Sequence, residues 1–282
     1  MRACRRVGAK SGHRGSGDQN KMRLHIHLQP VEADAQMPAD NYPLAAAIYG
    51  LLAAVAPAYA TFLHEEGYAA ERAGSELPAN KRFKFFVFSR LAQRGKRIAN
   101  NRIHLSDQLV TWQIGSPLDE PMAALAQSLL ALPGITIGDQ HSQAALHIAG
   151  VEIEEAPPLA DVWRCETLSP IFVASTEQNF RGQPVKHHVR ADVEALRFAQ
   201  GLAANLREKY EALTGEAAPA DSLLDFRFIE TPRSQLVSYK GTDHKAWMGR
   251  FTLRGDARLL RLAWEAGLGE ANSKGFGMFR VL

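Results

Sequence analysis

The C-terminal stretch constrains this chain most strongly, because it holds two Gly-x-Gly pairs, Gly267/Gly269 and Gly275/Gly277, around a polar centre. The preceding residues 256–266 place leucine, alanine and tryptophan at helical spacing, and the first glycine falls where helices commonly stop. The residues after the second pair alternate as a strand does. The sequence therefore predicts a glycine-rich loop that joins a helix to a final strand.

Such a loop can bind an anion, because glycine adopts positive φ at low cost and successive N–H groups can form a concave anion site. Asn272, Ser273 and Lys274 could add side-chain donors. A Rossmann fingerprint is excluded, since it would follow a strand and need glycine in place of Asn272, and a P-loop would need Gly-Lys-Ser/Thr. A tight connection that binds no ligand stays open as the alternative.

Charge is distributed unevenly along the chain. The 282 residues carry 33 basic and 30 acidic side chains, a formal charge of +3. Residues 1–22 hold six of the basic residues and one acid, so the remainder is slightly acidic. A nucleic-acid surface must then be a local patch. We expect residues 1–21 to be a disordered basic tail, with an RNA-contacting arm as the alternative.

The compartment follows from cysteine content and from the longest uncharged segment. The two cysteines, Cys4 and Cys165, allow no disulfide framework or cysteine metal cluster, which fits a reducing cytoplasm. Residues 42–63 carry no formal charge, so a membrane span must be considered. Pro57 interrupts this segment and its large apolar side chains lie on one stripe. We therefore expect a core helix, then a short helix with His64 in its last turn, and no membrane association.

An acid-free segment from Asn80 to Ser106 is the strongest candidate for a binding patch. Phenylalanines interleave with its basic residues, a composition typical of surfaces that bind RNA phosphates and stacked bases. The alternative is a hydrophobic strand flanked by solvated charge. The candidate RNA-binding cations are Lys81, Arg82, Arg90, Arg94, Lys96 and Arg97.

Strand and helix patterns recur twice in the order β-α-β-β-α-β. The first set has four strands and two helices. One strand lies within the acid-free segment, and the other three lie at 22–28, 108–114 and 144–153. The helices lie before Pro57 and at 118–132. The second set comprises strands at 162–175, 223–229, 247–253 and 276–281, and helices at 191–213 and 256–266. We predict an α+β fold of two tandem ferredoxin-like (RRM-like) domains, residues 22–158 and 159–282, joined after Ala156-Pro157-Pro158.

The first predicted strand carries His25 and His27 on its polar face. A His-x-His pair could ligate a metal, but no third ligand lies nearby in the sequence. We therefore expect a solvent-facing pair, and neither a metal nor a cofactor.

Residues Gly267 to Gly277 resemble the C-terminal glycine-rich signature of the RAMP superfamily, and within it the CRISPR-associated endoribonuclease family that cuts precursor CRISPR RNA in its repeats. Four further stretches are similar to the same family, and with the loop they extend from about residue 22 to the C-terminus. They are Asn41-Tyr42-Pro43 through Ile48-Tyr49, Phe62-Leu63-His64-Glu65-Glu66-Gly67-Tyr68, Lys84-Phe85-Phe86-Val87-Phe88-Ser89-Arg90-Leu91 and Thr167-Leu168-Ser169-Pro170.

The resemblance implies a metal-independent endoribonuclease that cleaves CRISPR repeat RNA by attack of the 2′-hydroxyl, leaving 2′,3′-cyclic phosphate ends. By motif, the catalytic tyrosine, histidine and lysine of active members correspond to Tyr49, His64 and Lys84, and Lys81 or Arg82 could replace the lysine. The same resemblance assigns RNA binding to Gly267, Gly269, Asn272, Ser273, Lys274, Gly275 and Gly277.

Each catalytic candidate also has a structural interpretation. Tyr49 fits a helix residue that covers the core, His64 a helix-end histidine, and Lys84 a solvated charge beside a strand. The alternative function is a non-catalytic RAMP-type subunit that holds RNA in a CRISPR effector complex, and a general RRM-like module is disfavoured because the strands lack an aromatic-rich ribonucleoprotein motif. Association with other effector subunits and a homodimer stay open.

Overall fold

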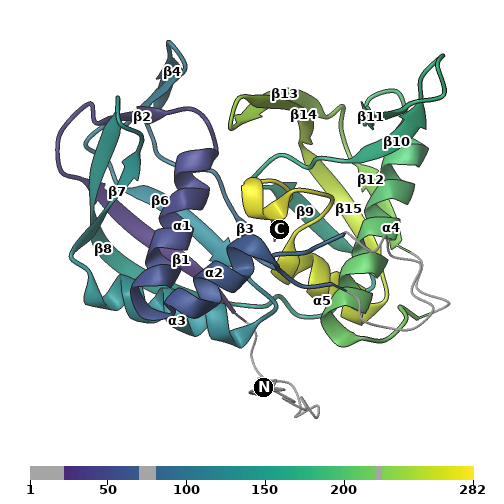
Figure 1. Cartoon of the computed structure of the whole chain (residues 1–282), viewed down its shortest axis with the longest axis horizontal. Coiled ribbons are helices and arrows are strands. Elements are labelled where there is room, and N and C mark those ends of the chain that lie inside the picture. Colours follow the sequence, from purple (N-terminus) through teal and green to yellow (C-terminus); the bar gives the residue numbers. More distant parts are fainter. Residues whose placement is uncertain (1–21, 70–80, 220–223) are drawn as a thin grey trace, which may run out of the picture.

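The computed structural model describes residues 22–69, 81–219 and 224–282. In these ranges two β-sheets with their helices lie side by side, one built from each half of the chain (Figure 1). This arrangement confirms the predicted mixed α+β fold. The expected tail at 1–21 and the loop at 71–80 fall outside the described residues.

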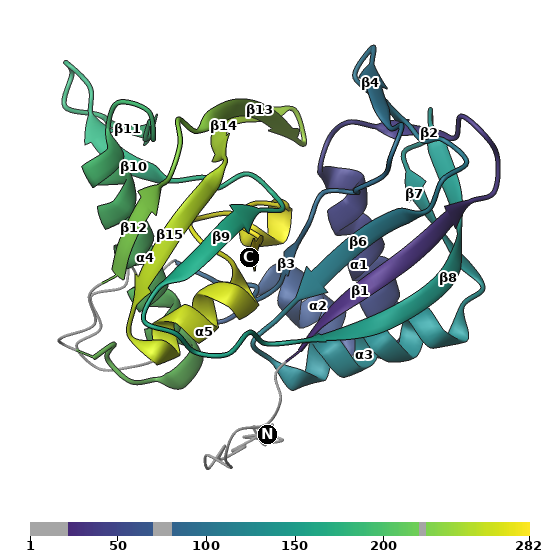
Figure 2. The ribbon, with the colours of Figure 1, turned by 180° about the vertical axis from the view of Figure 1, so that it is seen from behind.

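The first half forms a five-stranded antiparallel sheet in the order β3-β6-β1-β8-β7. Its strands are β1 (Met22–Pro30), β3 (Val87–Phe88), β6 (Val110–Gly115), β7 (Gly134–Gly138) and β8 (Gln143–Glu155). The helices α1 (Tyr42–Val55), α2 (Pro57–Glu65) and α3 (Asp119–Ala131) belong to this half. Figure 2 shows β6, β1 and β8 in front of α1 and α3, so the helices cover one face of the sheet.

The alternation in β1 decides which side chains reach the core. Leu24, Ile26 and Leu28 are buried in the cluster that includes the apolar residues of α1 and α3. Because successive strand residues point to opposite faces, Arg23, His25 and His27 lie on the other side of the sheet. The break between α1 and α2 falls at Ala56, just before Pro57, because proline has no N–H to continue the first helix.

The second half repeats the strand order of the first. Its four-stranded sheet has the order β12-β15-β9-β16. The elements are β9 (Trp163–Thr167), α4 (Ala195–Thr214), β12 (Leu224–Phe228), β15 (Arg250–Gly255), α5 (Ala257–Ala266) and β16 (Phe279–Val281). Numbering the four principal strands of each half along the chain gives the order 2-3-1-4 in both sheets. The expected linker at 156–158 lies between β8 and β9.

The short peripheral strands were not predicted from the sequence, apart from the ends of β10 (Ala174–Gln178) and β14 (Thr242–Met248) that overlap the strands expected at 162–175 and 247–253. The peripheral strands are β2 (Gln36–Pro38), β4 (Arg97–Ala99), β5 (Arg102–His104), β10, β11 (Pro184–His188), β13 (Arg233–Tyr239) and β14. They form a three-stranded sheet and two hairpins at the edges of the molecule (Figure 1). Most are exposed or half-buried, so they lack the apolar alternation that marks a core strand.

Three expected strands are corrected by the structure. The aromatic segment forms a strand only at Val87–Phe88, and Phe85, Phe86 and Phe88 are buried, so these rings are not available for base stacking. The strand expected at 162–175 ends at Thr167, and the strand expected at 247–253 is divided at Gly249 between β14 and β15.

The histidine pair in β1 is also corrected. It is half-buried instead of solvent-facing, and a third side chain with a ligand atom, Glu152, lies beside it. Pairing of β1 with β8 places Glu152 opposite His25, a proximity that sequence spacing cannot reveal.

Two buried polar side chains join the halves. Arg23 is fully buried and donates hydrogen bonds to the carbonyl oxygens of Phe279, at 2.6 Å, and Trp264. Its guanidinium lies 4.2 Å from the centre of the Trp264 ring. Asn41, just before α1, donates to the carbonyl oxygens of Lys274 and Gly275 at 3.0 and 3.2 Å. Within the described ranges, no helix is long and apolar enough to cross a membrane.

Candidate functional site

The structure brings together the three catalytic candidates from separate elements. Tyr49 comes from α1, His64 from the last turn of α2, and Lys84 from the segment before β3. The rings of Tyr49 and His64 meet edge to face, with centres 5.4 Å apart. The Lys84 ammonium lies 5.9 Å from the centre of the Tyr49 ring. A phenol, an imidazole and an ammonium therefore share one locality at the surface of the first half.

Lys84 is held by the end of α2. Its ammonium donates to the carbonyl oxygens of Leu63, at 2.6 Å, and His64. These carbonyls belong to the last turn of the helix, where a cation is favoured by the helix dipole. Two of the three ammonium donors are used in this way, so one can reach a phosphate oxygen. Lys84 thereby also fixes the backbone that carries His64.

Tyr49 and His64 bring different chemical groups to the site. Burial raises the pKa of the Tyr49 phenol well above its ordinary value, with Tyr239 adding to the effect. Tyr49 is therefore neutral near pH 7 and can donate a hydrogen bond, but it does not act there as a phenolate base. His64 is exposed, and imidazole is the side chain that ordinarily exchanges protons near neutrality.

A cavity of about 280 Å³ lies beside Lys84 and extends to the glycine-rich loop. Six of the predicted RNA-binding residues line it, namely Lys81, Arg82, Gly269, Asn272, Ser273 and Lys274. Burial together with neighbouring Lys274 lowers the pKa of Lys84. Burial, Lys186 and Lys240 lower the pKa of Lys274. This concentration of positive charge is suited to a phosphodiester.

The glycines of the loop meet demands of the fold. All four have positive φ, between +68° and +87°. A Cβ on Gly277 would lie 1.9 Å from the carbonyl oxygen of Leu268, and one on Gly269 would lie 2.4 Å from that of Phe172. The Asn272 amide donates to the carbonyl oxygens of Leu268 and Phe276, at 3.1 and 3.0 Å. The predicted donor Asn272 therefore braces the loop, which leaves Ser273 and Lys274 as its side-chain donors.

The remaining predicted cations lie apart from this cavity. Arg97, on β4, forms an ion pair with Asp34 at 3.2 Å. Lys96 donates to the carbonyl oxygen of Leu91, and burial together with Arg90 lowers the pKa of Lys96 to about 8. Arg94 is exposed. The basic residues of the acid-free segment therefore do not form one patch, because the segment passes through β3, β4 and β5.

Sequence reasoning missed two residues that shape the loop. Lys209 on α4 is fully buried and donates to the carbonyl oxygens of Gly267 and Gly269, at 2.7 and 2.9 Å. Asn41 holds the other end of the loop. The helical pattern did not predict that Lys209 is buried, since a lysine in a helix normally lies on the face exposed to solvent. Asn41 belongs to one of the family motifs, but the motif does not reveal its hydrogen bond to Lys274, which joins the two halves.

Known proteins resemble this chain in sequence and fold. Residues 154–281 match the family model described as CRISPR associated protein Cas6, C-terminal. The CRISPR-associated endoribonuclease Cas6 1 of Methanocaldococcus jannaschii is 25% identical over 260 residues, which cover 92% of each chain. The CRISPR-associated endoribonuclease Cas6 of Pyrococcus furiosus is 24% identical over 92% of this chain and 90% of that protein.

Solved structures agree with this similarity. One described as CRISPR associated protein Cas6 has a TM-score of 0.71 at 26% identity and covers 93% of this chain and 99% of its own. A Cas6-related protein from Pyrococcus furiosus has a TM-score of 0.76 at 20% identity, with coverage of 93% and 98%, and so shares the fold. The resemblance indicated by the sequence motifs is confirmed.

Proposed function

We propose, because this chain is related along nearly its whole length to the CRISPR-associated endoribonucleases, that it cleaves CRISPR repeat RNA in precursor transcripts. The observation that carries the proposal is the meeting of Tyr49, His64 and Lys84 beside a cationic cavity. We also infer that the two halves are tandem ferredoxin-like units, with residues 22–158 and 159–282 as domains, which their common strand order supports.

The proposed reaction uses a nucleophile that belongs to the substrate. The 2′-hydroxyl of the nucleotide before the cut loses its proton and its oxygen attacks the adjacent phosphorus. The bond from phosphorus to the 5′-oxygen breaks, and that oxygen takes up a proton. The products are a 2′,3′-cyclic phosphate and a 5′-hydroxyl. The protein must move two protons and stabilise the extra negative charge on the phosphorane.

The side chains are suited to these tasks. Imidazole is the side chain whose ordinary chemistry suits proton transfer as base or as acid, so we assign that role to His64. The neutral phenol of Tyr49 can donate a hydrogen bond to a phosphate or leaving oxygen. The third donor of Lys84 supplies positive charge at the phosphorane. None of these roles calls for a metal ion.

The RNA backbone would follow the cavity toward the glycine-rich loop. Lys274 is the strongest phosphate ligand we propose there, because its surroundings are cationic and an anion would relieve the repulsion. Lys81 is a weaker candidate, since Glu208 already lies 2.5 Å from its ammonium. Arg82 and Ser273 line the same cavity. Association with other effector subunits or a second copy of the chain is left to experiment.

Incubation of the purified protein with its cognate repeat RNA tests the proposal. We expect cleavage at one position within the repeat, unchanged by excess EDTA, with 2′,3′-cyclic phosphate ends on the upstream product. A strict requirement for a divalent ion, or 3′-hydroxyl ends, would contradict the mechanism. Tight binding without cleavage would instead support the alternative of a non-catalytic RAMP-type subunit.

A further inference from the structure

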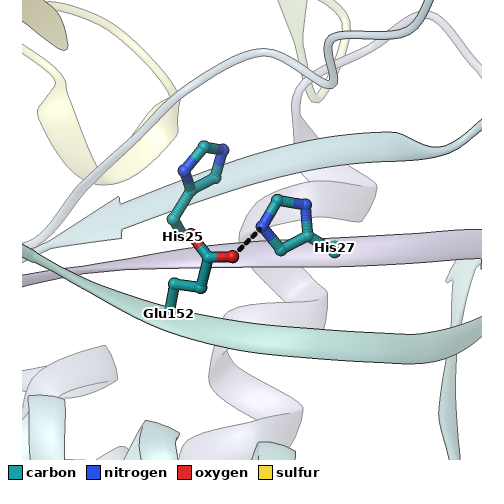
Figure 3. A group of neighbouring side chains, drawn as sticks. All are labelled: His25, His27 and Glu152. Atoms are coloured by element: carbon teal, nitrogen blue, oxygen red, sulfur yellow. Dashed lines mark ion pairs between the residues drawn. The ribbon is translucent and has the colours of Figure 1, made fainter.

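Two imidazoles and a carboxylate gather on the sheet face that the helices leave uncovered. His25 and His27 lie on β1, and Glu152 lies opposite His25 on β8. One potential ligand atom from each residue lies within 4.8 Å of the others. Figure 3 shows the Glu152 carboxylate directed at the His27 ring, with the His25 ring nearby on the same strand as His27. Tyr49 on α1 belongs to the other side of this sheet, so the cluster is separate from the proposed cleavage site.

The closest pair in this cluster already has the spacing of metal ligands. The Nε2 atom of His27 lies 3.3 Å from a carboxylate oxygen of Glu152. Two ligands bound tetrahedrally at about 2.0–2.1 Å from zinc are separated by roughly the same distance. Both ring nitrogens of His27 are buried; Nδ1 has no hydrogen-bond partner among the described residues, whereas Nε2 has the ion-pair contact with Glu152. A cation bound between Nε2 and the carboxylate would give this buried nitrogen and Glu152 a common partner.

The surroundings leave room for an ion to enter. Gly150 pairs with His27, and a Cβ added there would meet only the Cδ2 atom of His27, at 3.9 Å. The side chain of Glu152 is 70% exposed, whereas that of His27 is 19% exposed. An ion could therefore reach the imidazoles from solvent through the carboxylate and keep water as a further ligand. The strand register shifts immediately after His27, so the cluster lies where β1 and β8 are least regular.

We propose that His25, His27 and Glu152 form a binding site for a divalent transition-metal ion, with Zn²⁺ as the best-matched ion. Two imidazoles and one carboxylate are a donor set that zinc accepts, with water completing the tetrahedron. The ion connects β1 to β8 next to the register shift. Its function is to hold the two strands together, and the cleavage reaction proceeds without it.

Zinc titration of the full-length chain tests the site. The protein, prepared without a histidine tag and treated with a chelator, is titrated with Zn²⁺ in a calorimeter. We expect saturable binding that His27→Ala and Glu152→Gln each weaken at least about tenfold, since even residues that only orient a metal ligand contribute roughly 10–100-fold. Binding of Co²⁺ to the same protein should give the visible absorption of a tetrahedral site, which both substitutions remove.

His147→Ala is the matched control. His147 is exposed and lies on β8 opposite Gln29, outside the cluster, so its loss should leave zinc affinity unchanged. Glu152→Gln alters an exposed side chain and should fold normally even if His27→Ala does not. Absence of saturable binding, or equal affinity in the wild-type chain and Glu152→Gln, would overturn the metal site. Neither result bears on the ribonuclease proposal, because the readout is metal binding.

Discussion

The two halves of the molecule share a strand order but contribute different things to the candidate site. The first half supplies side chains, with Tyr49, His64 and Lys84 projecting from two helices and a connecting segment. The second half supplies a loop whose glycines have positive φ and whose neighbours leave no space for a Cβ, together with the side chains of Ser273 and Lys274. The same strand order thus positions the catalytic candidates in the first half and the glycine-rich loop in the second.

This difference predicts how each half responds to substitution. An exposed side chain such as His64 can be removed with little effect on packing, so its loss should act on the reaction. A glycine enclosed by backbone cannot be altered without moving the chain, so its replacement should act on stability first. The following experiments separate these two kinds of contribution.

His64→Ala should have the largest effect. We expect the single-turnover cleavage rate of repeat RNA to fall about 10²–10⁴-fold, the usual contribution of one proton-transfer group. RNA affinity and the unfolding midpoint should stay near their wild-type values, because the side chain is exposed. His141→Ala, another exposed histidine, is the control and should cut normally. Unimpaired cutting by His64→Ala would remove His64 from the mechanism.

Gly277→Ala should mainly lower the free energy of unfolding. The added Cβ would lie 1.9 Å from the carbonyl oxygen of Leu268 at a φ of +83°. Backbone strain and overpacking each cost roughly 1–3 kcal/mol, so we expect a loss of about 2–6 kcal/mol in denaturant unfolding.

Gly182→Ala is the control for that substitution. Gly182 has a φ of +71°, but no atom lies within 4 Å of its added Cβ. Only the strain of the left-handed conformation then applies, about 1–2 kcal/mol. Equal losses in the two variants would show that the close packing of the loop does not matter.

Lys274→Gln should weaken RNA binding without abolishing it. Loss of one phosphate contact should reduce affinity several-fold and lower the slope of log affinity against log salt by about 1. Arg97→Gln is the matched comparison, because Arg97 is already paired with Asp34 and lies on β4, away from the cavity. Filter-binding titrations at several salt concentrations measure both. A larger effect from Arg97→Gln would place the RNA path along β4 instead.

The smallest expected effect is on the alkaline limb of the pH profile. Burial and Lys274 lower the pKa of Lys84, so its ammonium loses the proton at a lower pH than an ordinary lysine does. Positive charge at the phosphorane is present below that pKa and lost above it. Cleavage rates should therefore decline as the pH becomes alkaline, and Lys84→Arg, which stays charged, should delay the decline. An identical profile in both proteins would exclude Lys84 as the group responsible.

Several features were accessible from the sequence because they depend on local pattern. The alternation at 22–28 and the helical spacing before Pro57 predicted β1 and α1, and paired glycines predicted the loop before the last strand. The motifs around Tyr49, His64 and Lys84 indicated the resemblance and so the candidate residues. Peripheral hairpins such as β13–β14 were not predicted as hairpins, because exposed strands carry little apolar periodicity.

The sequence by itself determined which elements form and which residue types are at hand. Only the tertiary structure decided that Lys84 holds the end of α2, that buried Lys209 and Asn41 brace the glycine loop, and that Glu152 joins the two histidines of β1. The physical reason is that local patterns act through neighbours a few positions apart, whereas these contacts join residues brought together by strand pairing and by the packing of one half against the other. Charge and hydrogen-bonding capacity can be read from the chain, but their partners are assigned only when the two sheets meet.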